Sequence, residues 1–214
     1  MTNHKDLPAA ELHEAKQIKT ATAAQAGQVI TPSSVDNEGE LRNLALDEIT
    51  MDSKRFAATG WANYQDSTYT LGSPLAVTSS TRTKLTIDGA GSESTSTYRA
   101  DGDAEYWNTS TNKITAEVIG DAFMVRLAFV AATAVALPVF LDIEFDVGGG
   151  LGAVLTDTRS LTRTSSSPNP MVFSWPTFAR SELVTNGGEL YVTPSANVNL
   201  YNFELFITKI HQQG

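Results

Sequence analysis

The sequence predicts an all-β protein in which a sandwich of short antiparallel strands follows an N-terminal arm. Three observations point to this fold class. Apolar and polar residues alternate in many short runs, which is the period of a strand with one buried face. Clusters of Gly, Pro, Asn and Asp separate these runs. Of the 214 residues, 26 are Thr and 18 are Ser, and a Thr-rich composition favours strands over helices.

Charge and composition exclude several classes of protein. Lys and Arg number 15 against 24 Asp and Glu, which gives a net charge of −9. A surface of that sign repels phosphate and the sequence has no basic patch, so we expect no nucleic-acid partner. Hydrophobic residues make up 41% of the chain and charged residues 18%. The chain is therefore too apolar to be disordered throughout and too poor in charge for a coiled coil.

Membrane spans and disulfides are not expected either. The longest apolar stretch, residues 122–145, is interrupted by Arg126, Pro138, Asp142 and Glu144, so it is predicted to form two strands and no membrane span. The sequence has no cysteine, which excludes disulfides and thiolate metal sites. The first residues lack a signal-peptide core, and we expect a soluble protein made in a cytoplasm.

Residues 1–50 are predicted to form an arm that is separate from a body at residues 51–214. The arm has no aromatic residue, since the first in the chain is Phe56, and it has too little apolar surface for a core of its own. It is predicted to be mostly extended, with short helical turns at residues 7–13 and 41–49. Such a segment gains order by lying on a partner and otherwise remains a flexible tail.

The body is predicted to contain about eight to ten strands separated by turns. Apolar residues alternate most regularly over residues 121–132 and 139–147, and the pattern is weaker over residues 155–163. Residues 89–105 are rich in Gly, Ser and Asp and are predicted to form a long loop. The other predicted strands cover residues 61–64, 66–71, 75–78, 84–88, 171–178, 189–193 and 197–211.

The last strand carries the longest alternation in the chain. Phe203, Leu205 and Ile207 share one face, and an apparent switch at Lys209 and Ile210 predicts a bulge or a frayed end. Because strands do not alternate with helices, the pattern favours a sandwich or barrel, and the length and paired strong strands favour a jelly-roll-like sandwich. A homotrimer would cover the apolar outer faces of such a body.

No catalytic constellation emerges from the sequence, and we expect no enzyme activity, no cofactor and no metal site. The three histidines, which lie in no triad-like or metal-binding context, are His4, His13 and His211. Asp142, Glu144 and Asp146 alternate along one strand face. A position facing solvent or a subunit is favoured there over the paired carboxylates of a glycoside hydrolase.

Two loops match ligand-binding motifs only in part. Residues 101–105 contain Asp101 and Asp103, but Asn112 stands where an EF-hand has its Glu, so a solvated loop is favoured over a calcium site. Residues 148–152 are glycine-rich and follow a strand, but a strand-like segment comes next. A flexible inter-strand loop is therefore favoured over a phosphate cradle.

The start of the chain carries a family resemblance. Residues 4–16 read His-Lys-Asp-Leu-Pro-Ala-Ala-Glu-Leu-His-Glu-Ala-Lys. This segment resembles the opening of a group of tailed-phage virion proteins, in which Leu-Pro-x-Ala-[Asp/Glu]-Leu-His-Glu-Pro-Lys precedes an Ala/Thr/Gly-rich stretch that ends in Gly-x-Val, here residues 21–29. Ala15 stands where these proteins usually have Pro. The resemblance covers residues 4–29, and the body resembles phage jelly-roll modules more loosely.

The resemblance implies a capsid decoration (cement) protein or a head fibre on the outer surface of the virion. Its arm would lie across neighbouring subunits of the major capsid protein, and its body would stand on the capsid as a homotrimer. Leu7, Pro8, Leu12 and His13 are the expected capsid contacts, because they are the bulky or ring-bearing residues around the first helical turn. The alternative is that these four side chains pack on their own body.

A second class, a receptor- or glycan-binding virion protein of a head or tail fibre, stays open. Jelly rolls bind sugars through loops at one end, and Tyr98, Tyr106 and Trp107 lie in or beside the predicted long loop. Their rings are able to stack on a sugar. They are equally suited to pinning the loop to the sandwich, and that interpretation is favoured. A polysaccharide-degrading enzyme is the weakest alternative.

Overall fold

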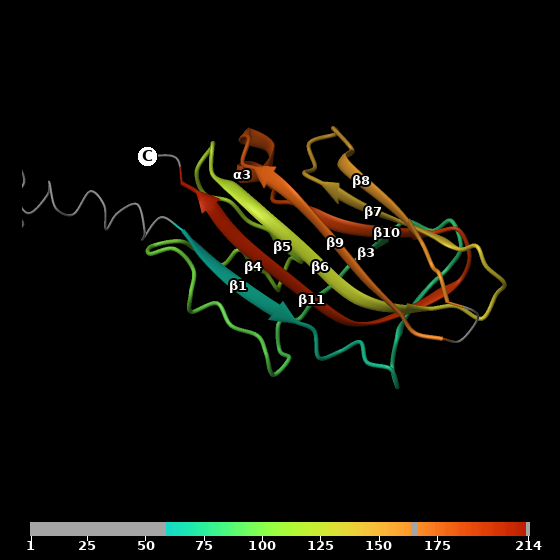
Figure 1. The fold of residues 1–214 in the computed structure, drawn as a ribbon. Helices are drawn as coiled ribbons and strands as arrows, with labels where there is room; N and C mark the ends of the chain where they lie inside the picture. The colour runs from blue at the N-terminus through green and yellow to red at the C-terminus, as the bar shows by residue number, and fades with distance from the viewer. Residues whose placement is uncertain (1–58, 164–166, 213–214) are drawn as a thin grey trace, which may run out of the picture. The chain divides into compact units, whose positions relative to one another are not determined.

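The computed structural model describes residues 59–163 and 167–212, which form two antiparallel β-sheets that enclose one core (Figure 1). The predicted all-β, jelly-roll-like fold is confirmed. The arm predicted for residues 1–50, its helical turns and the boundary after residue 50 lie outside the described residues.

The first sheet has five strands and the second has four. The strand order of the first sheet is β1 (Gly60–Gln65), β11 (Val198–His211), β6 (Ala122–Ala132) and β9 (Asn169–Phe178), and β2 (Leu75–Val77) also pairs with β11. The order of the second sheet is β3 (Thr83–Lys84), β10 (Glu189–Pro194), β7 (Phe140–Asp146) and β8 (Ala153–Ser160). A separate hairpin joins β4 (Trp107–Asn108) to β5 (Lys113–Ile114), and the helix α3 covers Ser181–Asn186.

The strand pairing is that of a jelly roll. Four antiparallel pairs are nested along the chain: β1 with β11, β3 with β10, β6 with β9, and β7 with β8. The first and third pairs lie in one sheet, and the second and fourth lie in the other. The chain is thus one long antiparallel hairpin that is rolled up into two sheets, which is the arrangement of a double-sheet jelly roll.

The core lies between the two sheets and follows the predicted alternation. In β6 the buried residues are Phe123, Val125, Leu127, Phe129 and Ala131, and their neighbours along the strand point to the other face. In β7 the same alternation buries Leu141, Ile143 and Phe145. Removing these side chains from water is the main driving force for closing the sandwich.

Two short elements were not predicted, and one predicted strand differs in character. The hairpin β4–β5 and the helix α3 are too short to show a period of their own. Strand β8 is largely exposed along both faces, which explains its weak pattern. Within the described part of the chain, no helix has the length and apolar character needed to cross a membrane.

Strand β11 contains the predicted irregularity near its end and another earlier. Its register against β6 shifts between Lys209 and His211, which confirms the predicted bulge, and again between Tyr201 and Glu204, around Asn202 with φ of 55°. The predicted switch to Ile210 as the buried residue is wrong. The alternation continues into Lys209, which is buried, and Ile210 is exposed.

Lys209 is buried because two carboxylates meet its ammonium group. Its Nζ lies 2.9 Å from Asp103 Oδ1, 3.0 Å from Asp103 Oδ2 and 2.9 Å from Asp121 Oδ2. Burial alone would lower the pKa of Lys209, but the hydrogen bonds to Asp103 and Asp121 outweigh burial and raise it. The cluster joins the end of β11 to the long loop through Asp103, and to the residue that precedes β6 through Asp121.

We predict that Lys209→Ala destabilises the protein strongly. The substitution leaves two carboxylates in a buried position without their cation, which is expected to lower the free energy of unfolding by about 3–5 kcal/mol. Chemical denaturation followed by tryptophan fluorescence measures this loss.

Asp157→Ala is the matched control for the Lys209 variant. It removes the Arg159 ion pair, which spans 2.9 Å between partly exposed side chains of β8, and such a pair is worth at most about 1 kcal/mol. Equal losses in the two variants would show that the buried cluster contributes no more than a surface pair.

Candidate functional site

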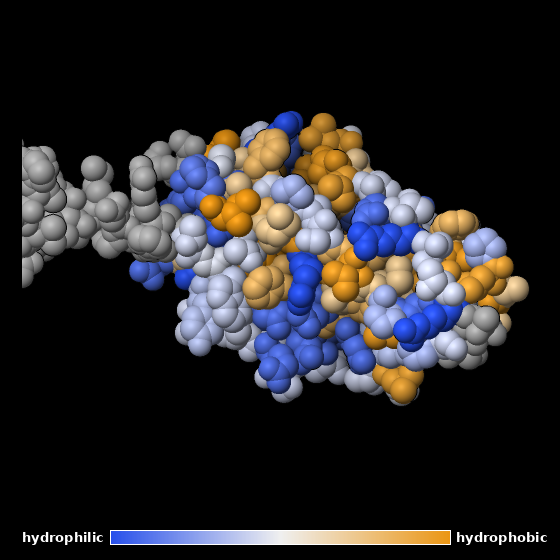
Figure 2. All heavy atoms as spheres, viewed as in Figure 1, coloured by the Kyte–Doolittle hydropathy of each residue, from blue (hydrophilic) through white to orange (hydrophobic). Residues whose placement is uncertain are grey.

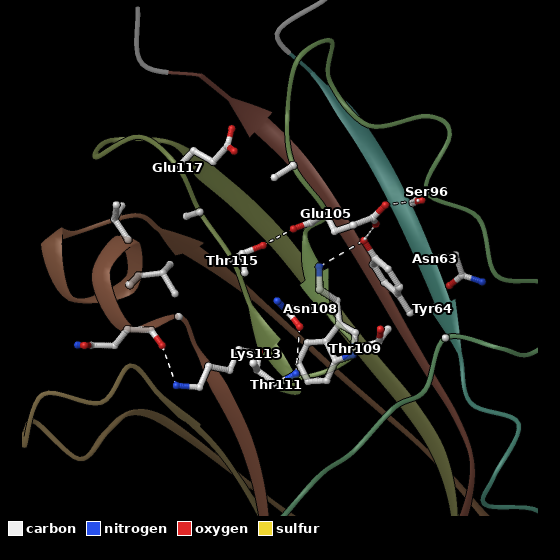
Figure 3. A pocket seen from close by; sticks show the side chains of 18 of the residues that line it. Asn63, Tyr64, Ser96, Glu105, Asn108, Thr109, Thr111, Lys113, Thr115 and Glu117 are labelled. Carbon is white, nitrogen blue, oxygen red and sulfur yellow. Dashed lines mark hydrogen bonds between the residues drawn. The ribbon is translucent and has the colours of Figure 1, made fainter.

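A broad, open pocket lies between β1, the hairpin β4–β5 and α3, with a cavity volume of about 920 Å³ (Figure 3). The long loop before β4 and the residues after β5 complete its walls. Most of the lining consists of hydroxyl, amide and carboxylate side chains. Those labelled in Figure 3 are Asn63, Tyr64, Ser96, Glu105, Asn108, Thr109, Thr111, Lys113, Thr115 and Glu117.

Tyr64 of β1 holds the loop side of the pocket in place. Its hydroxyl donates to Glu105 Oε2 over 2.8 Å and accepts the backbone N–H groups of Tyr106 at 3.1 Å and Trp107 at 3.3 Å. Burial, with a smaller contribution from Glu105, raises the pKa of Tyr64, so the hydroxyl stays protonated and continues to donate. The other Glu105 oxygen accepts the Ser96 hydroxyl at 3.0 Å.

The hairpin between the two walls is shaped by side-chain hydrogen bonds to the backbone. Asn108 Oδ1 accepts the N–H groups of Ser110 and Thr111, both at 3.0 Å, which is an Asx turn. The Trp107 indole N–H donates to the carbonyl oxygen of Ile87 over 2.9 Å, and the Ile87 N–H donates to Asn112 Oδ1 over 2.9 Å. The hairpin is therefore fixed to the segment that follows β3.

The helix side of the pocket is held by two lysines and one carboxylate. Glu189 Oε1 lies 2.8 Å from Lys84 Nζ and 3.5 Å from Lys113 Nζ. Lys113 also donates to the carbonyl oxygen of Asn186 at the end of α3, over 2.9 Å. Burial would raise the pKa of Glu189, but hydrogen bonds from Lys84 and Tyr191 lower it to about 2. The Lys113 ammonium group is thus occupied by structural partners.

The pocket suits a hydroxyl-rich ligand better than an anionic one. Within the described residues, the side chains of Thr109, Asn186 and Glu117 line the pocket and form no hydrogen bond. Together they offer donors and acceptors, and the Glu117 carboxylate adds a negative charge. No group of three or more His, Asp or Glu side chains in the described ranges is arranged to hold a metal ion.

The structure separates the three aromatic residues that the sequence placed in a possible glycan site. Tyr106 and Trp107 are buried, and Trp107 is only 1% exposed. The Tyr106 hydroxyl donates to Asp103 Oδ2 over 2.9 Å. Tyr98 is 58% exposed but stacks on Trp61, with ring centroids 4.7 Å apart. These contacts tie the loop to the sandwich.

The lining of the pocket was not foreseen from the sequence, and the predicted capsid contacts are not described. The pocket is assembled from residues 63–64, 88–117 and 183–187, which no local pattern connects. Leu7, Pro8, Leu12 and His13 lie outside the described residues.

Two of the three carboxylates on the acidic face of β7 are paired with a neighbouring arginine. Arg82 lies 2.6 Å from Glu144 and 2.7 Å from Asp146, and its guanidinium stacks 3.5 Å above the Tyr191 ring. The third carboxylate, Asp142, accepts the Thr158 hydroxyl at 2.5 Å. These carboxylates are partners in ion pairs and hydrogen bonds on the outer side of the second sheet.

The outward side of the first sheet is a second candidate surface, and we call it the outer face. It is formed by Trp61, Met124, Val172, Pro176, Phe178 and Phe206, which point away from the core. Val172 is 47% exposed and Phe178 is 55% exposed. Figure 2 shows hydrophobic residues beside hydrophilic ones over these strands. An exposed apolar sheet face of this kind is typical of an interaction surface.

Comparisons with known proteins leave the family open. No family model matches the chain, and the search of curated proteins finds no match. Among solved structures, Eiger TNF from S. frugiperda has 10% identity and a TM-score of 0.45, with 73% of this chain and 94% of that chain covered. The globular domain of zebrafish complement 1qA protein has 11% identity and a TM-score of 0.41, with 72% of this chain and 99% of that chain covered.

A viral protein is also among the similar structures. The PRD1 vertex protein P5 has 14% identity and a TM-score of 0.37, with 72% of this chain and 96% of that chain covered. All three TM-scores are below 0.5. The jelly-roll assignment therefore depends on the strand order described above, and the similarities are not extended to function.

We predict that Tyr64→Phe destabilises the pocket wall and changes its response to alkaline pH. Loss of the hydroxyl leaves the buried N–H groups of Tyr106 and Trp107 without this acceptor, which costs about 1–3 kcal/mol. The raised pKa of Tyr64 contributes stability below the unfolded-state pKa of about 10. That contribution declines as pH rises above this value, because the unfolded chain then releases the proton first.

Denaturation curves of wild type and variant between pH 8 and pH 11 measure both effects. The wild type is expected to lose more stability over this range than Tyr64→Phe. Tyr98→Phe is the control, since its exposed hydroxyl forms no hydrogen bond within the described residues. Parallel pH profiles for wild type and Tyr64→Phe would contradict the prediction.

Proposed function

We propose that this protein is a virion structural protein that binds the outer surface of the major capsid lattice and stabilises the head as a decoration, or cement, protein. One observation supports this most directly. A jelly-roll body, which begins at β1, follows a segment at residues 4–29 that resembles the opening of tailed-phage virion proteins.

In this proposal the N-terminal segment makes the capsid contact. Leu7, Pro8, Leu12 and His13 bind the major capsid protein, and the segment gains order as it binds. The body forms a homotrimer, so that three segments act together and each raises the effective concentration of the others. The stabilising effect comes from contact area shared with the shell, and no reacting group, cofactor or nucleic acid takes part. The protein is made in the host cytoplasm and acts on the virion surface.

We predict that the double variant Leu7→Ala/Leu12→Ala binds capsids at least tenfold more weakly than wild type. Burying one leucine side chain is worth about 1.5–3 kcal/mol, and 1.4 kcal/mol is a tenfold change in affinity. The measurement is stoichiometric rebinding of purified protein to capsids that lack it, followed by sedimentation of the particles.

The control for capsid binding is Leu41→Ala/Leu44→Ala, which alters the same N-terminal region outside the resembling segment. It is expected to bind like wild type. Deletion of residues 1–50 is expected to abolish rebinding and leave a folded, trimeric body. Full rebinding by the deleted protein would transfer the capsid contact to the body, and no rebinding by wild type would overturn the decoration role.

A glycan-binding virion protein is the second candidate, and the open polar pocket is the observation that favours it. Its volume of about 920 Å³ and its lining of hydroxyl and amide groups suit a sugar. Stacking is the missing part, because the Trp107 ring beneath the pocket is buried.

The glycan candidate predicts saccharide binding by the isolated protein on a glycan array. Asn186→Ala is expected to reduce that binding by about tenfold, since a hydrogen bond contributes about 1 kcal/mol or somewhat more. Asn199→Ala, at an exposed position outside the pocket lining, is expected to have no effect. An array without signal for wild type would remove the candidate.

A further inference from the structure

The two outward sides of the sandwich differ in chemistry. On the second sheet, the outward positions of β7 carry the Arg82–Glu144 and Arg82–Asp146 ion pairs, and Asp142 accepts the Thr158 hydroxyl of β8. On the outer face of the first sheet, the outward positions of β1, β11, β6 and β9 carry only two charged side chains, Arg126 and Glu204. The first sheet is thus the one whose outward side is mostly apolar.

The two charges on the outer face neutralise each other. Arg126 lies 2.6 Å from Glu204 on the neighbouring strand, and its guanidinium lies 5.6 Å from the centre of the Phe206 ring. The outward positions of the four strands therefore sum to no net charge, and the Arg180 guanidinium, 4.8 Å from the centre of the Phe178 ring, adds a cation beside the end of β9, although the chain carries −9. This contrast matters for the choice of partner, because two copies of a strongly acidic protein repel each other wherever acidic surfaces meet.

The aromatic part of the outer face is already ordered. Trp61 stacks on Phe206 with ring centroids 5.4 Å apart, and Tyr98 stacks on the other side of Trp61 at 4.7 Å. The cross-strand register places Thr208 between Trp61 and Met124, and Met124 next to Pro176. Aromatic residues, Met and Arg are the types that protein–protein interfaces favour. Side chains held in a row lose little freedom on binding.

We propose that the outer face of the first sheet is the surface through which copies of this protein associate with one another. A second copy is the partner that the charges favour, because it presents the same largely apolar face, which carries no excess of negative charge. Association through this face leaves the charged outward side of the second sheet in solvent. This inference rests on the self-association included in the proposed function and specifies the surface that makes it.

The test measures the mass of the full-length protein in solution, in the absence of capsids, by sedimentation velocity. Wild type is expected at a multiple of 23.0 kDa, three for the proposed trimer. Val172→Asp on β9 and Met124→Glu on β6 each introduce a charge into the outer face. Both variants are expected to be monomeric at concentrations where wild type is assembled, which is a loss of affinity of at least a hundredfold.

The matched control is Leu71→Asp, which places the same charge at a more exposed apolar residue, 72% accessible, in the turn between β1 and β2. It is expected to assemble like wild type. Near-ultraviolet circular dichroism confirms that each variant is folded, and the variant positions are partly exposed, so folding is expected to survive.

Two results would overturn the inference. One is a monomeric wild type. If Val172→Asp then also weakens capsid rebinding, the capsid protein occupies the outer face in place of a second copy. The other is assembly of folded Val172→Asp and Met124→Glu at wild-type affinity. The proposed function is tested separately, because a trimer that does not bind capsids would refute decoration and leave the self-association surface intact.

Discussion

The buried ammonium group of Lys209 is the interaction on which the arrangement of the functional surfaces depends. It joins three separate segments, because Asp103 belongs to the long loop, Asp121 precedes β6 and Lys209 lies near the end of β11. Asp103 also accepts the Tyr106 hydroxyl. The position of the loop, and with it one wall of the pocket and the stacking of Tyr98 on Trp61, follows from this cluster.

The sandwich divides its surface between two kinds of chemistry. One sheet presents ion pairs outward, and the other presents aromatic and aliphatic side chains around a single neutralised pair. Successive side chains of a strand point to opposite faces, so the residues between the core positions determine the chemistry of each outward side. Either chemistry is therefore compatible with the same core. A fold of this kind is able to bind through one outward side while the other side stays in water.

Most of the fold was predictable because burial leaves a period-two signal. Residues 121–132 and 139–147 showed it clearly, and both are central strands of the sheets. The helix α3 and the hairpin β4–β5 were missed, since each depends on contacts with distant segments such as Lys113 with Asn186. Lys209 was misjudged for a related reason. A lysine in an apolar row resembles the end of a strand unless its partners, Asp103 and Asp121, are known to lie beside it.

The candidate site was less predictable than the fold. The aromatic residues Tyr106 and Trp107 drew attention as possible ligand contacts, but a ring in a loop also serves as an anchor, and sequence alone does not separate these roles. The pocket lining comes from three stretches that only the folded chain brings together. The first segment of the chain contributed the functional hypothesis through its sequence, and its contacts lie beyond the described residues.

The pairing of β1 with β11 has a consequence for how the body is presented. Gly60 lies opposite Lys209, so the chain enters the sandwich beside the place where its last strand ends (Figure 1). The turns at residues 133–139 and 195–197 lie at the opposite end, because Ala132 pairs with Asn199 near the start of β11. In a body attached through its entry strand, these two turns would therefore lie at the far end, and a peptide grafted into either turn would be displayed there.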